Sequence, residues 1–153
     1  MARRQSRVLA LRVLFAMEVG RHSLEDALRQ ELSDEPQAFA DYAREICLGV
    51  DRQRERIDGL IAQLSRGWSL PRLAAVDRCL LRMAAYELLE QPGIPSNAIV
   101  SEAVELASIY STEEAPRFVN GLLARMAGEL GRPLSERGAE APEDADGDDG
   151  QEH

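Results

Sequence analysis

Three arginines close to the start of the chain are the clearest candidates for binding chemistry. Arg3, Arg4 and Arg7 are three and four residues apart, with Gln5 among them, so in a helix the arginines share one side. A guanidinium group can donate two hydrogen bonds to one phosphate. The first turn of a helix adds backbone N–H donors and the positive end of its dipole. The spacing therefore indicates a phosphate-binding surface, with a solvated basic terminus as the alternative reading.

A search for catalytic residues gives a different result. His22 and His153 are the only histidines, and the sequence has no glycine-rich phosphate loop, dinucleotide-binding motif or metal-binding spacing of His and Cys. Acidic pairs such as Glu102 and Glu105 fit an exposed helix surface better than a catalytic cleft, because acid–base chemistry needs burial to shift a pKa. We therefore expect a protein that is not an enzyme and that holds no cofactor and no metal.

Charge is distributed unevenly along the chain. The formal net charge is −9, and all 18 basic residues are arginines. Residues 135–153 hold eight acidic residues against Arg137 alone, a net charge of −7, which leaves −2 for the other 134 residues. A body this close to neutral is compatible with nucleic-acid binding at its basic start. Because Gly, Ala and Pro separate the acids after Pro133, residues 135–153 are expected to form a disordered acidic tail.

The sequence also indicates where the protein works. No apolar run approaches the roughly 20 residues that a membrane span needs, and the basic start lacks the apolar stretch of a signal peptide. Cys47 and Cys79 each lie in an apolar helical pattern, which is typical of buried thiols. We expect a cytoplasmic protein with no membrane contact.

Apolar residues recur at helical spacing through most of the chain, and no segment alternates with the period of a strand. Helices are expected over about 4–19, 23–32, 36–64, 69–89, 96–110 and 111–130, with Gly49 bending or breaking the third. Ser23, Ser96 and the pair Ser111 and Glu114 have the pattern of helix caps. The fold class is therefore all-α, with six or seven helices. A division near Gly67 separates an N-terminal bundle (1–67) from a C-terminal bundle (68–134).

Four motifs, in order along residues 2 to about 130, resemble the NusB family. The first is the arginine-rich start at residues 2–7 followed by Ala10, Leu14 and Phe15. The others are the run LAAVDRCLLRMAAYEL at 73–88, Ile94-Pro95 with SEAVELA at 101–107, and FVNGLL at 118–123.

The resemblance implies a NusB-like fold of two packed three-helix subdomains. It also implies binding of the boxA segment of ribosomal RNA transcripts, together with the ribosomal protein NusE, in a complex that helps RNA polymerase to pass terminators. The positions that match RNA-binding residues of the family are Arg3, Arg4, Gln5, Arg7, Arg117 and Phe118. Phe15 and Asp77 match positions at the NusE interface.

Without the resemblance, several of these residues have simpler interpretations. Phe15 and Phe118 have the spacing of core residues. Asp77 fits a solvated charge or a local ion pair with Arg78 or Arg82. Trp68 fits a packing anchor between the two bundles.

Two other functions are compatible with the sequence. The first is a domain of an enzyme, because some ribosomal RNA cytosine methyltransferases begin with a NusB-like domain. This sequence, however, has no following region with strands and a glycine-rich nucleotide-binding turn. A protein-interaction module that has lost RNA binding would explain Gln5, where the family often has arginine, and Ser108, where it often has lysine.

Overall fold

The computed structural model describes residues 2–67 and 69–135, and these residues are built from helices and connecting segments without a strand. A short 3-10 turn, η1 (Leu70–Arg72), precedes the fifth helix. The α-helices are α1 (Ala2–Val19), α2 (Leu24–Leu32), α3 (Gln37–Arg52), α4 (Arg54–Leu64), α5 (Ala75–Glu90), α6 (Ser96–Tyr110) and α7 (Ala115–Glu129). The predicted all-α fold of six or seven helices is confirmed. The predictions for Trp68 and for the acidic tail after Ser135 lie outside the described residues.

Local signals explain some of the helix ends. The Ser23 hydroxyl caps α2 by accepting a hydrogen bond from the backbone N–H of Asp26 at 3.1 Å, as predicted. The cap predicted at Ser96 is wrong, because Ser96 is already the first residue of α6 and follows Pro95. The capping box predicted at Ser111 is also wrong, since α7 begins at Ala115 without a side-chain cap. The helix start predicted at Ser69 is also wrong, because Ser69 precedes only the 3-10 turn η1 and the long helix α5 begins at Ala75.

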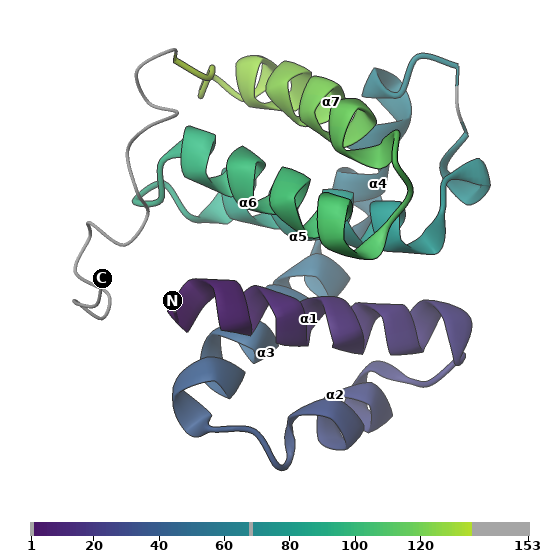
Figure 1. The fold of residues 1–153 in the computed structure, drawn as a ribbon, viewed down its shortest axis with the longest axis vertical. Coiled ribbons are helices and arrows are strands. Elements are labelled where there is room, and N and C mark those ends of the chain that lie inside the picture. Colours follow the sequence, from purple (N-terminus) through teal and green to yellow (C-terminus); the bar gives the residue numbers. More distant parts are fainter. Residues whose placement is uncertain (1, 68, 136–153) are drawn as a thin grey trace.

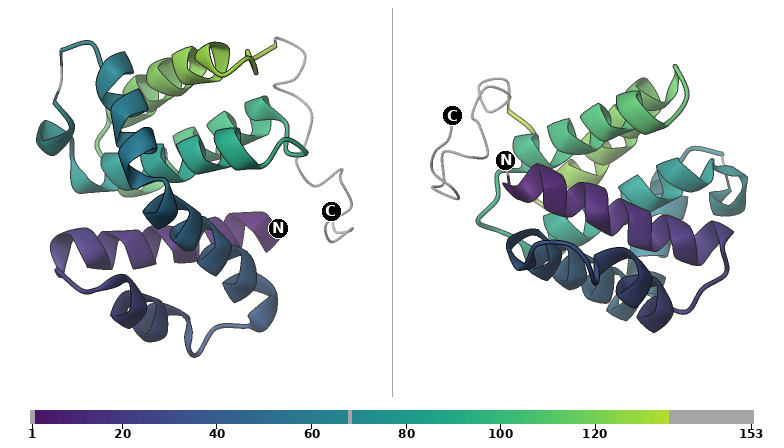
Figure 2. Two further views of the ribbon diagram at one scale, coloured as in Figure 1. Left: turned by 180° about the vertical axis from the view of Figure 1, so that it is seen from behind. Right: turned by 60° about the horizontal axis from the view of Figure 1, so that its bottom comes forward.

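The helices form two groups (Figure 1). Helices α1, α2 and α3 pack together in the lower half of the view, and α5, α6 and α7 in the upper half. Helix α4 follows α3 after a break at Gln53, and it packs against α5 and α7. Figure 2 shows α3 and α4 in succession along the back, passing from one group to the other. The buried apolar residues of both groups form one cluster, so the boundary near Gly67 stays a prediction.

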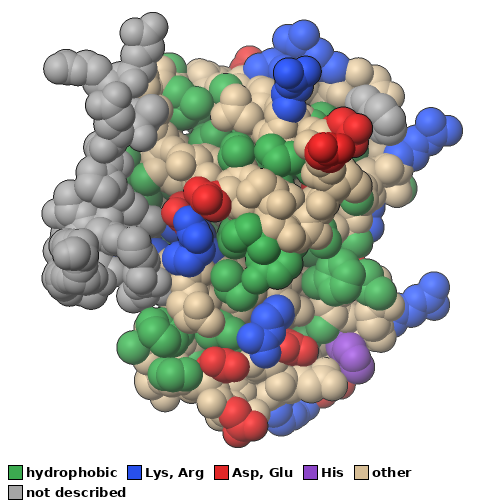
Figure 3. Space-filling view, in the orientation of Figure 1, with side chains coloured by type: hydrophobic (Ala, Val, Ile, Leu, Met, Phe, Trp, Pro, Cys, Tyr) green, Lys and Arg blue, Asp and Glu red, His purple; other side chains and the backbone are tan. Residues whose placement is uncertain are grey.

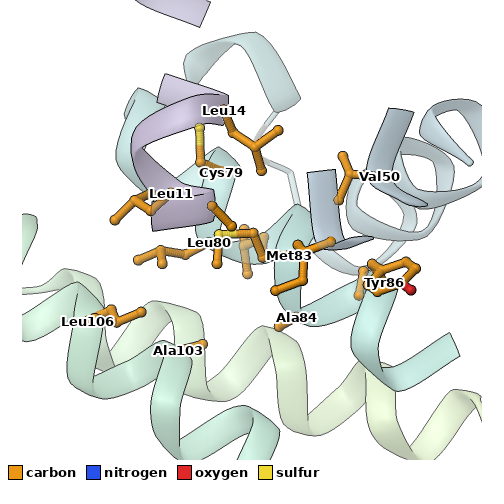
Figure 4. Packing of buried hydrophobic residues seen from close by; sticks show 14 of the residues in the cluster. Leu11, Leu14, Val50, Cys79, Leu80, Met83, Ala84, Tyr86, Ala103 and Leu106 are labelled. Atoms are coloured by element: carbon orange, nitrogen blue, oxygen red, sulfur yellow. The ribbon is translucent and has the colours of Figure 1, made fainter. Parts of the chain in front are cut away.

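Helix α5 lies at the centre and contacts α1, α3, α4, α6 and α7. Every residue of α5 from Cys79 to Leu88 is buried, as expected for a helix that is apolar on nearly all sides. Figure 4 shows Leu80 and Met83 of α5 among side chains of α1, α3 and α6. Cys47 and Cys79 are buried, as predicted, and burial raises the pKa of the Cys79 thiol to about 12. No helix in the described part of the chain could span a bilayer.

Gly49 allows α3 to approach α5 closely. Helix α3 continues through Gly49 to Arg52, and the break comes at Gln53, four residues later than predicted but still before Ile57. A Cβ atom at Gly49 would overlap the ring of Tyr86 on α5, which is itself buried. The glycine therefore serves helix packing, and its missing side chain is what the neighbouring ring requires.

We expect Gly49→Ala to lower the free energy of unfolding by about 1–3 kcal/mol, because the buried ring must shift to admit the methyl group. Gly59→Ala is the matched control. Gly59 lies inside α4 with open space around it, so alanine should raise stability by about 0.5–1 kcal/mol. Urea unfolding of both variants measures the difference. Equal effects of the two substitutions would show that the contact with Tyr86 does not constrain α3.

Candidate nucleic-acid and partner interface

The first turns of α1 place the three predicted arginines at different depths. Arg3 is half-buried, and its guanidinium carbon lies 5.6 Å from the centre of the Tyr42 ring on α3, within the range of a cation–π contact. Arg4 is 35% exposed at the edge of the helix, whereas Arg7 is 2% exposed. Gln5 is half-buried beside them. The prediction that all three arginines share one exposed surface is therefore wrong for Arg7.

Arg7 points inward because α5 supplies a buried carboxylate. Its Nε and Nη2 donate to Oε1 and Oε2 of Glu87, each at 2.9 Å, and the Glu87 side chain is also 2% exposed. The Tyr42 hydroxyl donates to the same Glu87 Oε2 at 2.5 Å. Burial and the adjacent carboxylate raise the pKa of Tyr42, so the hydroxyl stays protonated and acts as a donor. This network joins α1, α3 and α5.

Arg4 is held by a different helix, α6. Its Nε donates to Glu102 Oε1 at 2.6 Å and its Nη2 to Glu102 Oε2 at 3.0 Å, in the two-pronged geometry that arginine and carboxylate favour. Glu105 Oε1 lies 3.7 Å from Arg4 Nη2. The side-chain hydrogen bond from Glu102 raises the pKa of Arg4. Glu102 is therefore the ion-pair partner of Arg4, although its sequence pattern had indicated a solvated charge.

An apolar groove lies further along α1, beside the start of α5 and the end of α6. It encloses about 390 Å³, and Phe15 and Tyr110 at its sides are 37% and 48% exposed. Apolar side chains gather over the band between α1 and α6 in Figure 3. Exposed aromatic residues around a hollow are typical of a protein-binding site, so the core interpretation of Phe15 is wrong. The residues that line the groove are Val8, Leu11, Arg12, Phe15, Ala16, Glu31, Val76 and Tyr110.

A second hollow of about 200 Å³ contains Asp77 and Phe118. Asp77 is buried and accepts a hydrogen bond from the Ser111 hydroxyl at 2.8 Å, so its interpretation as a solvated charge is wrong. Phe118 is half-buried against the core, and Arg117 beside it is exposed. Val76 lines the first hollow and Asp77 the second, so the first turn of α5 contributes a residue to each.

Arg78 and Arg82 on α5 do not pair with Asp77 but fasten neighbouring helices. Both donate to the Glu18 carboxylate near the end of α1, at 2.6 Å and 2.9 Å. Arg82 also donates to Asp58 on α4 at 2.8 Å. Burial opposes the charge of Glu18, yet the hydrogen bonds from the two arginines prevail and lower its pKa. The half of α1 that carries Phe15 is thus tied to α5.

Comparison with known proteins decides the family. The sequence model of the NusB family matches residues 4–128. The chain belongs to the NusB family. "Transcription antitermination protein NusB" of Heliobacterium modesticaldum is 46% identical over 140 residues, which cover 90% of this chain and 68% of the relative. The protein of the same name from Kineococcus radiotolerans is 42% identical over 134 residues, which cover 88% and 98% of the two chains.

Two solved NusB structures resemble this fold. T. maritima NusB superposes with a TM-score of 0.78 at 38% identity, over 82% of this chain and 90% of that chain. A structure of antitermination factors NusB and NusE in complex with double-stranded RNA gives a TM-score of 0.71 at 25% identity, over 84% and 97% of the two chains.

This NusB family member brings some of the predicted site residues together and separates others. Arg3, Arg4 and Gln5 lie at one end of α1, and Phe15, Asp77 and Phe118 gather around the two hollows. Sequence reasoning missed Tyr42, Glu87 and Glu102. Of these three residues, Glu87 had a signal in the sequence, because a charge within the apolar run of α5 needs a buried partner.

We expect Arg7→Met to lower the free energy of unfolding by about 3–5 kcal/mol, because it leaves the buried Glu87 carboxylate without its cation. Adding Glu87→Gln should restore much of that loss, since the double variant buries no charge. Arg4→Ala, one turn away at a more exposed pair, should cost at most about 1 kcal/mol. Urea unfolding measures all three variants. A loss for Arg7→Met as small as that for Arg4→Ala would contradict a structural role for Arg7.

Proposed function

We propose that this chain is a transcription antitermination factor that binds boxA RNA of ribosomal RNA transcripts together with NusE and helps RNA polymerase to read through terminators. It acts in the cytoplasm and without enzymatic activity. One observation carries the proposal: a single face of the molecule presents arginines at one end and an exposed aromatic groove at the other. The relatives named as antitermination proteins, and the solved complex of NusB with NusE and RNA, support this use of the face.

The RNA contacts are proposed at the beginning of α1 and at α7. Arg3 and Arg4 are accessible enough to meet phosphates, and Gln5 can add a neutral hydrogen bond. Phe118 with the exposed Arg117 offers an aromatic surface for a base and a cation for its phosphate. Arg7 contributes by holding α1 against α5, because its guanidinium is already committed to Glu87.

NusE is proposed to occupy the groove beside Phe15. The groove is largely apolar, and its two aromatic side chains are exposed in the isolated chain. Binding there would bury both rings, which is a favourable use of aromatic surface. Asp77, in the second hollow, is proposed as a further part of the NusE interface.

A protein-interaction module without RNA binding is the second candidate. It is favoured by one observation, the pairing of Arg4 with Glu102, which neutralises a cation that RNA would need. The two candidates differ in one measurement, the affinity for boxA RNA in the presence and absence of NusE.

The double variant Arg3→Ala/Arg4→Ala should bind a single-stranded boxA RNA more weakly than the wild type. Each lost phosphate contact should also reduce the slope of log affinity against log salt by about 0.7. Fluorescence anisotropy across a salt series measures both. The control is Arg21→Ala/Arg29→Ala, which removes two exposed arginines beyond the far end of α1. If both double variants bind with the wild-type slope, the start of α1 does not contact phosphate.

Phe15→Ala should weaken binding of NusE by about tenfold or more, because truncating a central aromatic residue typically costs over 1 kcal/mol. RNA binding in the absence of NusE should be unchanged. Leu48→Ala is the matched control, since Leu48 on α3 is 38% exposed but lies outside the groove. Isothermal titration with purified NusE measures the affinities. Equal NusE affinity for the Phe15 variant and the wild type would place the partner elsewhere.

A further inference from the structure

We propose that Glu102 is an affinity-determining residue that competes with RNA for Arg4, so that RNA binding exchanges a carboxylate for a phosphate. The inference rests on the proposed function and concerns the regulation of the same surface. It assigns a role to α6, whose acidic residues are not among the residues expected to contact RNA.

The geometry of the pair supports competition. Glu102 accepts from both Nε and Nη2 of Arg4, at 2.6 Å and 3.0 Å, and these are donors that a phosphate would use. A guanidinium cannot offer the same two donors to a carboxylate and a phosphate at once. Because the Arg4 and Glu102 side chains remain 35% and 19% exposed, an incoming phosphate can reach the pair.

Arg7 makes the exchange feasible. Its Nη1 lies 3.9 Å from Glu102 Oε1, and Arg7 is itself fixed by Glu87. When Arg4 turns towards RNA, the Glu102 carboxylate therefore remains beside a cation instead of being left half-buried without one. Arg7 thus acts through Glu102 and touches no RNA.

Glu105 provides an internal comparison. Its carboxylate lies 3.7 Å from Arg4 Nη2, and its side chain is 55% exposed. A longer and more solvated ion pair is weaker, so Glu105 should restrain Arg4 less than Glu102 does. The two glutamates lie one turn apart on α6 and differ mainly in how tightly they hold the arginine.

The test measures binding of a single-stranded boxA RNA oligomer to the full chain by fluorescence anisotropy over a salt series, with and without NusE. Glu102→Gln should bind RNA about two- to fivefold more tightly, with a salt slope steeper by up to about 0.7. Glu105→Gln should give a smaller gain. Glu55→Gln on α4 removes one acidic charge from an exposed position away from α1 and α6 and should give none.

A double-mutant cycle identifies the cause of the gain. In an Arg4→Ala background, Glu102→Gln should bring no further increase, because the competed cation is gone. An equal gain in that background, or weaker binding by Glu102→Gln in the wild type, overturns the inference.

Glu102→Asp, which keeps the charge but shortens the side chain, should show an intermediate gain in RNA affinity, and it replaces Glu102→Gln as the test if the glutamine variant does not fold. Absence of RNA binding by the wild type, even with NusE, would overturn the proposed function as well; binding by the wild type with no change in Glu102→Gln overturns this inference alone.

Discussion

The buried pair of Arg7 and Glu87 constrains the position of α1. Two opposite charges sit almost without solvent in a cluster of apolar side chains, where an unpaired charge would be costly. The desolvation of the two charges is offset only when the guanidinium group of Arg7 faces the carboxylate of Glu87 closely enough for both hydrogen bonds to form. The Tyr42 hydroxyl supplies one more hydrogen bond. A rotation or a sliding of α1 by a fraction of a turn would lose that geometry. The pair therefore specifies how α1 lies on α5, beyond what apolar packing alone would specify.

Once Arg7 points inward, helical geometry determines what α1 presents to its surroundings. At 3.6 residues per turn, positions 4, 8, 12, 15 and 19 fall on one stripe, about a quarter of a turn from Arg7. Arg4 and Phe15 are therefore on the same side of the helix, separated by about 16 Å along its axis. Glu102 meets the first of these residues, and Tyr110, two turns later on α6, shares the groove of the second. The positions of Arg4 and Phe15 on the surface of α1 therefore both follow from the one buried contact of Arg7.

The sequence predicts the helices because helical periodicity and caps such as Ser23 are local signals. It does not predict the pairing of charges, since Arg7 and Glu87 are 80 residues apart and Arg4 and Glu102 are 98 apart. An arginine near a terminus is normally exposed, which is why local reasoning places Arg7 on the surface. A sign was available: Arg7 stands three, four and seven residues before Ala10, Leu11 and Leu14, all buried in the core. A charge on an apolar stripe requires a partner, but only the folded structure identifies it.

The same arrangement explains how a protein with a net charge of −9 could bind RNA. Net charge governs long-range attraction, whereas affinity at contact depends on which cations face the phosphates. At the start of α1, Arg4 and Arg7 are already paired with carboxylates of the protein itself, so only weak phosphate binding is expected from the chain alone. Under the proposed function, NusE would bind about 16 Å further along α1, and its own charges could extend the cationic surface there. Coupling between RNA and NusE would then need no conformational change. By linkage, RNA and NusE would each raise the affinity of the chain for the other by the same factor.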